Sequence, residues 1–306
     1  MKRSTIAVMN TKGGVGKSTL VLAVAETLTA VHGKSVLVID SDSQASVSSM
    51  LMTSVRLHKL QSDATTIVDL LANTVLQRQP LDWAKYVVAG SSDIDDATGL
   101  YLIPSDMQLT LFEREVSRES LHGALRTTIH ALLEGVRAAF DVVLIDCPPG
   151  LSVLTESWLR EADFHISPTK PDYISVCGLE VFRRFKALNP EMGFAENLGV
   201  VVNLMDPTGA QDRDYDAWLR ERADNRCFTA PIHRSLALQH ITQFSQEGRS
   251  WLGKYPGSVG MAIKSICNEI LERMAEPQRT DVPLAAAASV VTAPTEAEFT
   301  EMPAAE

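Results

Sequence analysis

The sequence predicts a doubly wound α/β fold, in which helices cover both faces of a mostly parallel, twisted sheet. Short apolar runs alternate along the chain with longer segments of helical length. Several of the short runs are apolar at every position, as in Val142-Val143-Leu144-Ile145. Runs of this kind are typical of strands that are buried on both faces, as in a parallel sheet.

The strands and helices are expected in alternation. The predicted strands are Thr5–Met9, Ser35–Asp40, Leu100–Ile103, Asp141–Asp146, Phe164–Ser167 and Leu198–Asn203. The predicted helices are Ser18–Val31, Leu109–Glu119, Leu121–Ala139, Val153–Glu161 and Cys177–Leu188. This order predicts one α/β domain over residues 1–275. Residues 276–306 are rich in Ala, Pro, Thr and Glu, which is typical of a disordered, solvated tail; a partner-binding tail is the alternative.

Composition excludes several classes of protein. The four cysteines form no CxxC pair, which argues against a zinc or iron–sulfur site within one chain and fits a reducing compartment. The N-terminal apolar run is too short for a signal peptide or a membrane span, so a cytoplasmic location without a membrane partner is expected. The net charge of −10 means that any contact with nucleic acid must come from a local basic patch.

A phosphate-binding loop is predicted directly after the first strand. The segment Lys12-Gly13-Gly14-Val15-Gly16-Lys17-Ser18-Thr19 joins that strand to the first helix. Glycines let successive backbone N–H groups turn toward phosphate oxygens, and the helix N-terminus favours negative charge. Lys17 would neutralise the β- and γ-phosphates, and the Ser18 hydroxyl would ligate Mg²⁺. The predicted cofactors are therefore ATP and Mg²⁺.

The loop departs from the general pattern GxxxxGK[ST] at one position. Thr11 stands where that pattern has its first glycine, and Lys12 is a second lysine within the loop. In this form the segment resembles the deviant Walker A motif of the ParA/MinD/nitrogenase-iron-protein superfamily. The resemblance implies that Lys12 reaches the nucleotide of a partner subunit, as an arginine finger does, so that ATP would drive formation of a homodimer.

Two aspartate motifs follow at the ends of later strands. Asp40-Ser41-Asp42-Ser43-Gln44 lies where carboxylates face the ligand crevice of a parallel sheet, and it resembles the DxDxQ motif of the superfamily. The resemblance implies that Asp42 activates the attacking water and that Asp40 supports the Mg²⁺ shell. The apolar run before Asp146 is typical of a Walker B strand, in which Asp146 would hold Mg²⁺. Cys147 follows in place of a glutamate, which leaves the role of base to Asp42.

The resemblance extends from about Lys2 to Met274. The segment Ile166–Tyr173 is similar to the one that passes beside the base in ParA proteins, so Pro171 and Asp172 are expected at the nucleotide. Asn203 ends a predicted strand, and its amide could pair with adenine. The segment Pro231–Ser235 is similar to a late segment of partition ATPases. The cofactor-binding residues expected in all are Gly13, Gly14, Val15, Gly16, Lys17, Ser18, Thr19, Asn203, Pro171 and Asp172.

The early position of the loop indicates a small ParA-type ATPase without an N-terminal helix-turn-helix. Such proteins segregate plasmid or chromosomal DNA, or position a cargo, by binding double-stranded DNA without sequence preference while a ParB-like or cargo adaptor stimulates hydrolysis. A nucleoid-associated location follows. DNA phosphates are expected to contact Arg234, Arg213 and Arg249. The alternatives are a P-loop metabolic enzyme and a MinD-like positioning ATPase that does not use DNA, although the acidic C-terminal residues do not fit a basic membrane helix.

Overall fold

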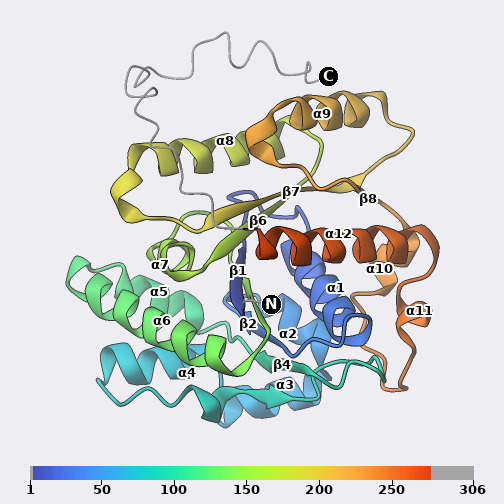
Figure 1. The fold of residues 1–306 in the computed structure, drawn as a ribbon. Coiled ribbons are helices and arrows are strands. Elements are labelled where there is room, and N and C mark those ends of the chain that lie inside the picture. Colours follow the sequence, from blue (N-terminus) through green and yellow to red (C-terminus); the bar gives the residue numbers. More distant parts are fainter. Residues whose placement is uncertain (1–2, 277–306) are drawn as a thin grey trace.

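The computed structural model describes residues 3–276, and within them an eight-stranded sheet forms in the order β3-β4-β2-β5-β1-β6-β7-β8. Neighbouring strands are parallel except for β3 and β4 at one edge. Helices cover both faces (Figure 1). The predicted doubly wound, mostly parallel α/β fold is therefore confirmed. The tail predicted for residues 276–306 lies, from residue 277, outside the described residues.

All six predicted strands are present. They are β1 (Ser4–Val8), β2 (Val36–Asp40), β4 (Leu100–Ile103), β5 (Val142–Asp146), β6 (Phe164–Thr169) and β7 (Glu196–Met205). Two short strands at the edges were not predicted, β3 (Val88–Ala89) and β8 (Ile232–His233). Two residues carry little periodicity, so the sequence pattern gives no signal for either edge strand.

The two faces of the sheet carry different sets of helices. Ile6 and Val8 of β1 pack on one side, and Ala7 on the other. The first side is covered by α1 (Lys17–Ala30), α2 (Ser46–Leu51), α3 (Ser54–Ser62), α10 (Leu236–His240), α11 (Trp251–Lys254) and α12 (Gly257–Ala275). The second side is covered by α4 (Ile67–Leu71), α5 (Leu109–Val116), α6 (Glu119–Ala139) and α7 (Val153–Glu161). A third cluster packs α8 (Tyr173–Leu188) and α9 (Ala210–Glu221) against β7.

The strand register brings the predicted site residues together. β5 lies between β1 and β2, so Asp146 stands opposite Val8 on one side and opposite Asp40 on the other. The carboxyl ends of these three strands therefore meet at one edge of the sheet, directly below the loop that links β1 to α1. Among the helices of residues 3–276, none is long and apolar enough to cross a membrane.

Candidate nucleotide-binding site

The loop between β1 and α1 has the conformation that its glycines allow. Gly14 and Gly16 lie in the left-handed region, with φ of 74° and 87°. A Cβ on Gly16 would also collide with the side-chain amide of Asn203. That amide donates a hydrogen bond of 2.9 Å to the carbonyl of Val15. Asn203 of β7 therefore supports the glycine-rich turn that leads into α1.

Three side-chain contacts hold the first half of the loop. Asn10 donates to the carbonyl of Pro168 at 2.8 Å and accepts the backbone N–H of Lys12 at 2.9 Å. The Thr11 hydroxyl donates to the carbonyl of Gly178 in α8 at 2.9 Å. Thr11 thus occupies the position of the missing glycine with a hydroxyl that ties the loop to α8. The departure from the general P-loop pattern has a structural reason.

The two loop lysines lie in opposite environments. The Lys17 side chain is buried, and its Nζ lies 3.5 Å from the carbonyl oxygen of Asn10 and 3.4 Å from that of Lys12. Burial lowers the pKa of Lys17, while the nearby carboxylates of Asp146 and Asp42 act in the opposite direction. Lys12, in contrast, is exposed to solvent. Lys17 is therefore held within the loop, and Lys12 is accessible to another molecule.

Two buried carboxylates lie side by side below the loop. Asp40 and Asp146 are paired in register and are both fully buried. Asp40 accepts hydrogen bonds from the backbone N–H and the hydroxyl of Ser48, at 2.9 and 2.6 Å. Burial raises the pKa of Asp40 to about 6. Burial and the charge of Asp40 raise the pKa of Asp146 well above its usual range, with a smaller opposing effect from the Ser18 hydroxyl.

The carboxylate of Asp146 is buried and suits the binding of a cation. Within residues 3–276 neither of its carboxylate oxygens has a hydrogen bond of ordinary geometry. A buried carboxylate without a partner is costly, and a bound cation would remove that cost. The oxygen donors of Ser18, Asp146 and the adjacent aspartates suit Mg²⁺. The described residues contain no group of three or more His, Cys, Asp or Glu that could hold a metal ion.

Asp42 lies at the accessible side of this pair. Its side chain is 9% exposed and accepts the backbone N–H of Gln44 at 2.9 Å. The structure adds Glu113 of α5, which the sequence analysis missed. Glu113 accepts the hydroxyl of Ser152 at 2.7 Å, and its pKa is raised by burial and then by the charge of Asp42. A glutamate on an amphipathic helix carries no sequence signal for such a position.

A cavity of about 530 Å³ opens beside the loop. It is lined by Gly16, Thr19, Lys170, Leu204, Arg234, Ser235, Leu238, Gln239 and Thr242. Of the residues predicted beside the base, Pro171 is buried next to Lys170, and the Asp172 side chain caps α8 by accepting the N–H of Ser175 at 2.8 Å. The side-chain amide of Asn203 donates its hydrogen bond to the Val15 carbonyl. Pairing of this amide with adenine stays a prediction.

The three arginines predicted to bind DNA lie in different places. Arg213 is exposed on α9, and Arg234 is exposed but lines the cavity beside the loop. Arg249 forms an ion pair of 2.7 Å with Asp93, whose side chain is fully buried. This ion pair gives Arg249 a buried partner within the chain, and its contact with a DNA phosphate stays a prediction.

Comparison with solved structures identifies proteins that have the same fold. Cobyrinic acid a,c-diamide synthase from Mycobacterium smegmatis, solved with an ATP analog and magnesium, has a TM-score of 0.70 at 24% identity, over 89% of this chain and 96% of its own. A variant of McdA from Cyanothece in complex with ATP has a TM-score of 0.69 at 19% identity, over 90% and 98%. At these identities the two structures share the fold.

Sequence comparison defines the family. The chromosome partitioning protein ParA of Caulobacter vibrioides is 27% identical over 280 residues, which cover 89% of this chain and 96% of ParA. The family model described as an AAA domain matches residues 3–192, a range that holds the phosphate loop and both aspartate motifs. This chain therefore belongs to the AAA-domain family, as a ParA-like P-loop ATPase of the ParA/MinD superfamily.

Proposed function

We propose that this protein is an ATP-dependent dimerising switch that binds double-stranded DNA without sequence preference and hydrolyses ATP to segregate DNA or to position a cargo. The observation that carries the proposal is the contrast between the two loop lysines. Lys17 is buried at the loop, whereas Lys12 is exposed beside it. An exposed cation at this position suits a phosphate of a nucleotide in a second copy of the chain.

The residues around the loop suit in-line attack of water on the γ-phosphate. Backbone N–H groups of Gly13–Thr19 would hold the phosphates, with Lys17 neutralising the negative charge. Ser18 and Asp146 would hold Mg²⁺, which supplies charge stabilisation to the phosphates when bound. Asp42, the most accessible of the three aspartates, would orient the water. Asp40, bonded to Ser48, would keep the neighbouring carboxylate in place.

The nucleoside would occupy the cavity that continues from the loop. Its volume of about 530 Å³ lies within the usual range of small-molecule sites. Gly16 and Thr19 belong to the phosphate loop and also line this cavity, so one ligand can contact the loop and the cavity together. The basic side chains of Lys170 and Arg234 supply positive charge around it. We therefore assign Arg234 to the nucleotide first, and Arg213 becomes the leading candidate for contact with a DNA phosphate.

Binding of random-sequence duplex DNA by the Asp42→Ala protein tests the switch. This variant should bind ATP without turnover, so the ATP state persists during the measurement. We expect salt-sensitive DNA binding with ATP, and little with ADP or without nucleotide. Adding Arg213→Ala should weaken binding to all sequences alike and lower the salt slope by about one, as loss of one phosphate contact requires. The matched control is Arg78→Ala, at an exposed arginine just after the π-helical segment Ala72–Leu76 that follows α4.

Two results would contradict the proposal. Absence of DNA binding in every nucleotide state, despite ATP-dependent dimerisation, would favour a MinD-like or metabolic role that does not use DNA. DNA binding that is equal with ATP, with ADP and without nucleotide would remove the switch.

A further inference from the structure

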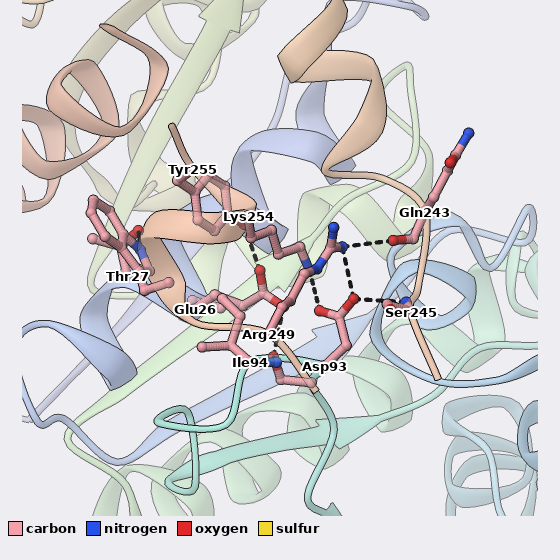
Figure 2. Close-up of polar contacts among 12 residues, drawn as sticks. Glu26, Thr27, Asp93, Ile94, Gln243, Ser245, Arg249, Lys254 and Tyr255 are labelled. Atoms are coloured by element: carbon pink, nitrogen blue, oxygen red, sulfur yellow. Dashed lines mark hydrogen bonds and ion pairs between the residues drawn. The ribbon is translucent and has the colours of Figure 1, made fainter. Parts of the chain in front are cut away.

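A buried charge cluster lies against α1, away from the phosphate loop, and only one of its residues, Glu26, belongs to that helix. It consists of Glu26, Asp93, Arg249 and Lys254, and Figure 2 shows their side chains converging. The side chains of Glu26, Asp93 and Lys254 are fully buried. Two acids and two bases give a formal charge of zero. The nucleotide chemistry proposed above uses none of these four residues.

The contacts within the cluster are short, and both carboxylates have several partners. Lys254 contacts Glu26 and Asp93 at 2.7 Å each, and Arg249 contacts the other Asp93 oxygen at 2.7 Å. Glu26 also accepts the hydroxyls of Ser92 at 2.7 Å and Tyr255 at 2.5 Å. The two acids come from the first hundred residues and the two bases from the C-terminal part of the chain. The cluster therefore fastens the C-terminal segment to the body of the domain.

The fastened segment forms one wall of the cavity. Five of the residues that line the cavity lie between Arg234 and Thr242, a stretch we call the pocket wall. At its N-terminal end, Arg234 donates its N–H to Met205 of β7 at 2.9 Å. Just beyond its C-terminal end, the backbone carbonyl of Gln243 accepts a hydrogen bond from the Arg249 guanidinium at 2.7 Å. The Ser245 N–H donates to the Asp93 carboxylate at 2.8 Å (Figure 2).

Backbone contacts strengthen the C-terminal attachment. Residues Ile94 and Arg249 form a parallel β-bridge, in which the Arg249 N–H donates to Asp93 at 3.0 Å and the Asp95 N–H donates to Arg249 at 3.1 Å. Gly248 has no side chain here, and a Cβ would collide with the Asp95 carboxylate. The segments around Ile94 and Arg249 therefore lie close together, and their contact depends on the pairing of these two residues.

The same helix carries the phosphate loop and the cluster. Lys17 opens α1, and Glu26 lies about 14 Å further along its axis at the standard helical rise. Buried ion pairs add little net stability compared with apolar packing, but a mispaired buried charge is costly. A cluster of this kind therefore suits the fixing of one position more than the strengthening of the fold.

We propose that the charge cluster positions the pocket wall against the phosphate loop, so that Arg249 and its partners set the affinity for the nucleoside part of the ligand. The four residues are positioning residues, since none of them lines the cavity. This inference rests on the proposed nucleotide site. It predicts that loosening the cluster weakens binding of a complete nucleotide and spares binding of its phosphates alone.

The test compares ADP with inorganic tripolyphosphate by calorimetry, both with Mg²⁺. Arg249→Met keeps most of the side-chain packing and leaves the Glu26–Lys254 pair intact. We expect its affinity for ADP to fall about tenfold through lost preorganisation of the wall, and its affinity for tripolyphosphate to stay within about twofold. Arg249→Lys should recover most of the ADP affinity. Amides of residues 236–245 should exchange hydrogen faster in Arg249→Met than in the wild type.

The matched control is Arg220→Met in α9. Arg220 pairs with Asp216 at 2.9 Å and is exposed to a similar degree, 30% against 24% for Arg249. It does not line the cavity, so both affinities should stay at the wild-type value. If Arg249→Met does not fold, Asp93→Asn, which keeps the side-chain shape and removes the charge, is measured in the same way.

The outcomes separate this inference from the proposed function. Equal loss of ADP and tripolyphosphate affinity would assign the cluster to general stability and overturn the inference. Unchanged ADP affinity in a folded variant would overturn it as well. A wild-type protein that binds neither ligand would reject the nucleotide site itself, and the inference with it.

Discussion

A single buried histidine illustrates how one residue can set the response of the molecule to acid. His165 in β6 is 4% exposed, and its Nδ1 lies 2.9 Å from the carbonyl oxygen of Ala195. Its ring packs edge-on to Phe182 at 5.2 Å between centroids. Burial, with a smaller effect of the Lys186 charge, lowers the pKa of His165 from 6.5 to about 3.

The sign of the effect follows from proton linkage. Between pH 6.5 and about 3 the unfolded chain binds a proton at this position that the folded chain excludes. The free energy of unfolding therefore falls as the pH falls through this range, and above pH 6.5 the histidine has no effect. His165→Gln keeps a donor for Ala195 and removes the titration. Between pH 7 and pH 5, urea unfolding should show the wild type losing about 2 kcal/mol more than the variant. Parallel losses in the two proteins would contradict the assignment.

At the scale of elements, the packing of α8 against the phosphate loop depends on one glycine. A Cβ on Gly178 would lie 2.7 Å from Asn10 Oδ1 and 2.8 Å from Thr11 Oγ1. Both atoms belong to side chains that hold the first half of the loop. Alanine at this position would displace these side chains, although alanine stabilises a helix interior by about 1 kcal/mol relative to glycine.

We expect Gly178→Ala to lower ATP affinity by about tenfold, because the side chains of Asn10 and Thr11 must move and the loop loses its preorganised N–H groups. Isothermal titration with ATP measures this, and a thermal melt checks the fold. Gly123→Ala is the matched control, since Gly123 lies inside α6 with no atom within 4 Å of the added Cβ. Equal ATP affinities in the two variants would show that α8 does not set the loop conformation.

The sequence predicted the centre of this fold better than its periphery. Runs such as Val142–Ile145 are buried on both faces, so their apolar pattern alone identifies β5 and its neighbours. The helices between Ser46 and Leu71 and those after Ala210 were missed. Several of them have five or six residues or fewer, which is less than two turns of periodicity. The positions of these short helices are set by tertiary packing.

The same contrast holds for the site. Local motifs placed Lys17, Asp40 and Asp146, because a loop after a strand and a carboxylate at a strand end have a local signature. The charge cluster joins residues more than 150 positions apart, as the Asp93–Lys254 contact does. No spacing in the sequence marks such a pair. The ion pair of Arg249 with Asp93 was not anticipated for this reason, since a lone arginine in the sequence does not indicate a buried partner.

At the scale of the whole molecule, the proposed ATP-dependent dimer would depend on the exposed Lys12. Lys12 N–H is held by Asn10 at 2.9 Å, while its side chain extends from an exposed position of the loop. Its removal leaves Lys17, Ser18 and the three aspartates in place. Lys12→Ala should therefore bind ATP with nearly the wild-type affinity, within about threefold, and fail to form a dimer with it.

Sedimentation velocity with ATP and Mg²⁺, in an Asp42→Ala background that blocks turnover, measures this directly. The background protein should sediment as a dimer with ATP and as a monomer without nucleotide. With Lys12→Ala added it should stay monomeric in both conditions. Lys59→Ala is the control, because Lys59 is an exposed lysine of α3 that pairs with Asp63, and it should leave the dimer intact. An ATP-dependent dimer in the Lys12→Ala protein would remove the role of this lysine across the interface. The ATP switch would then have to depend on another contact between the subunits.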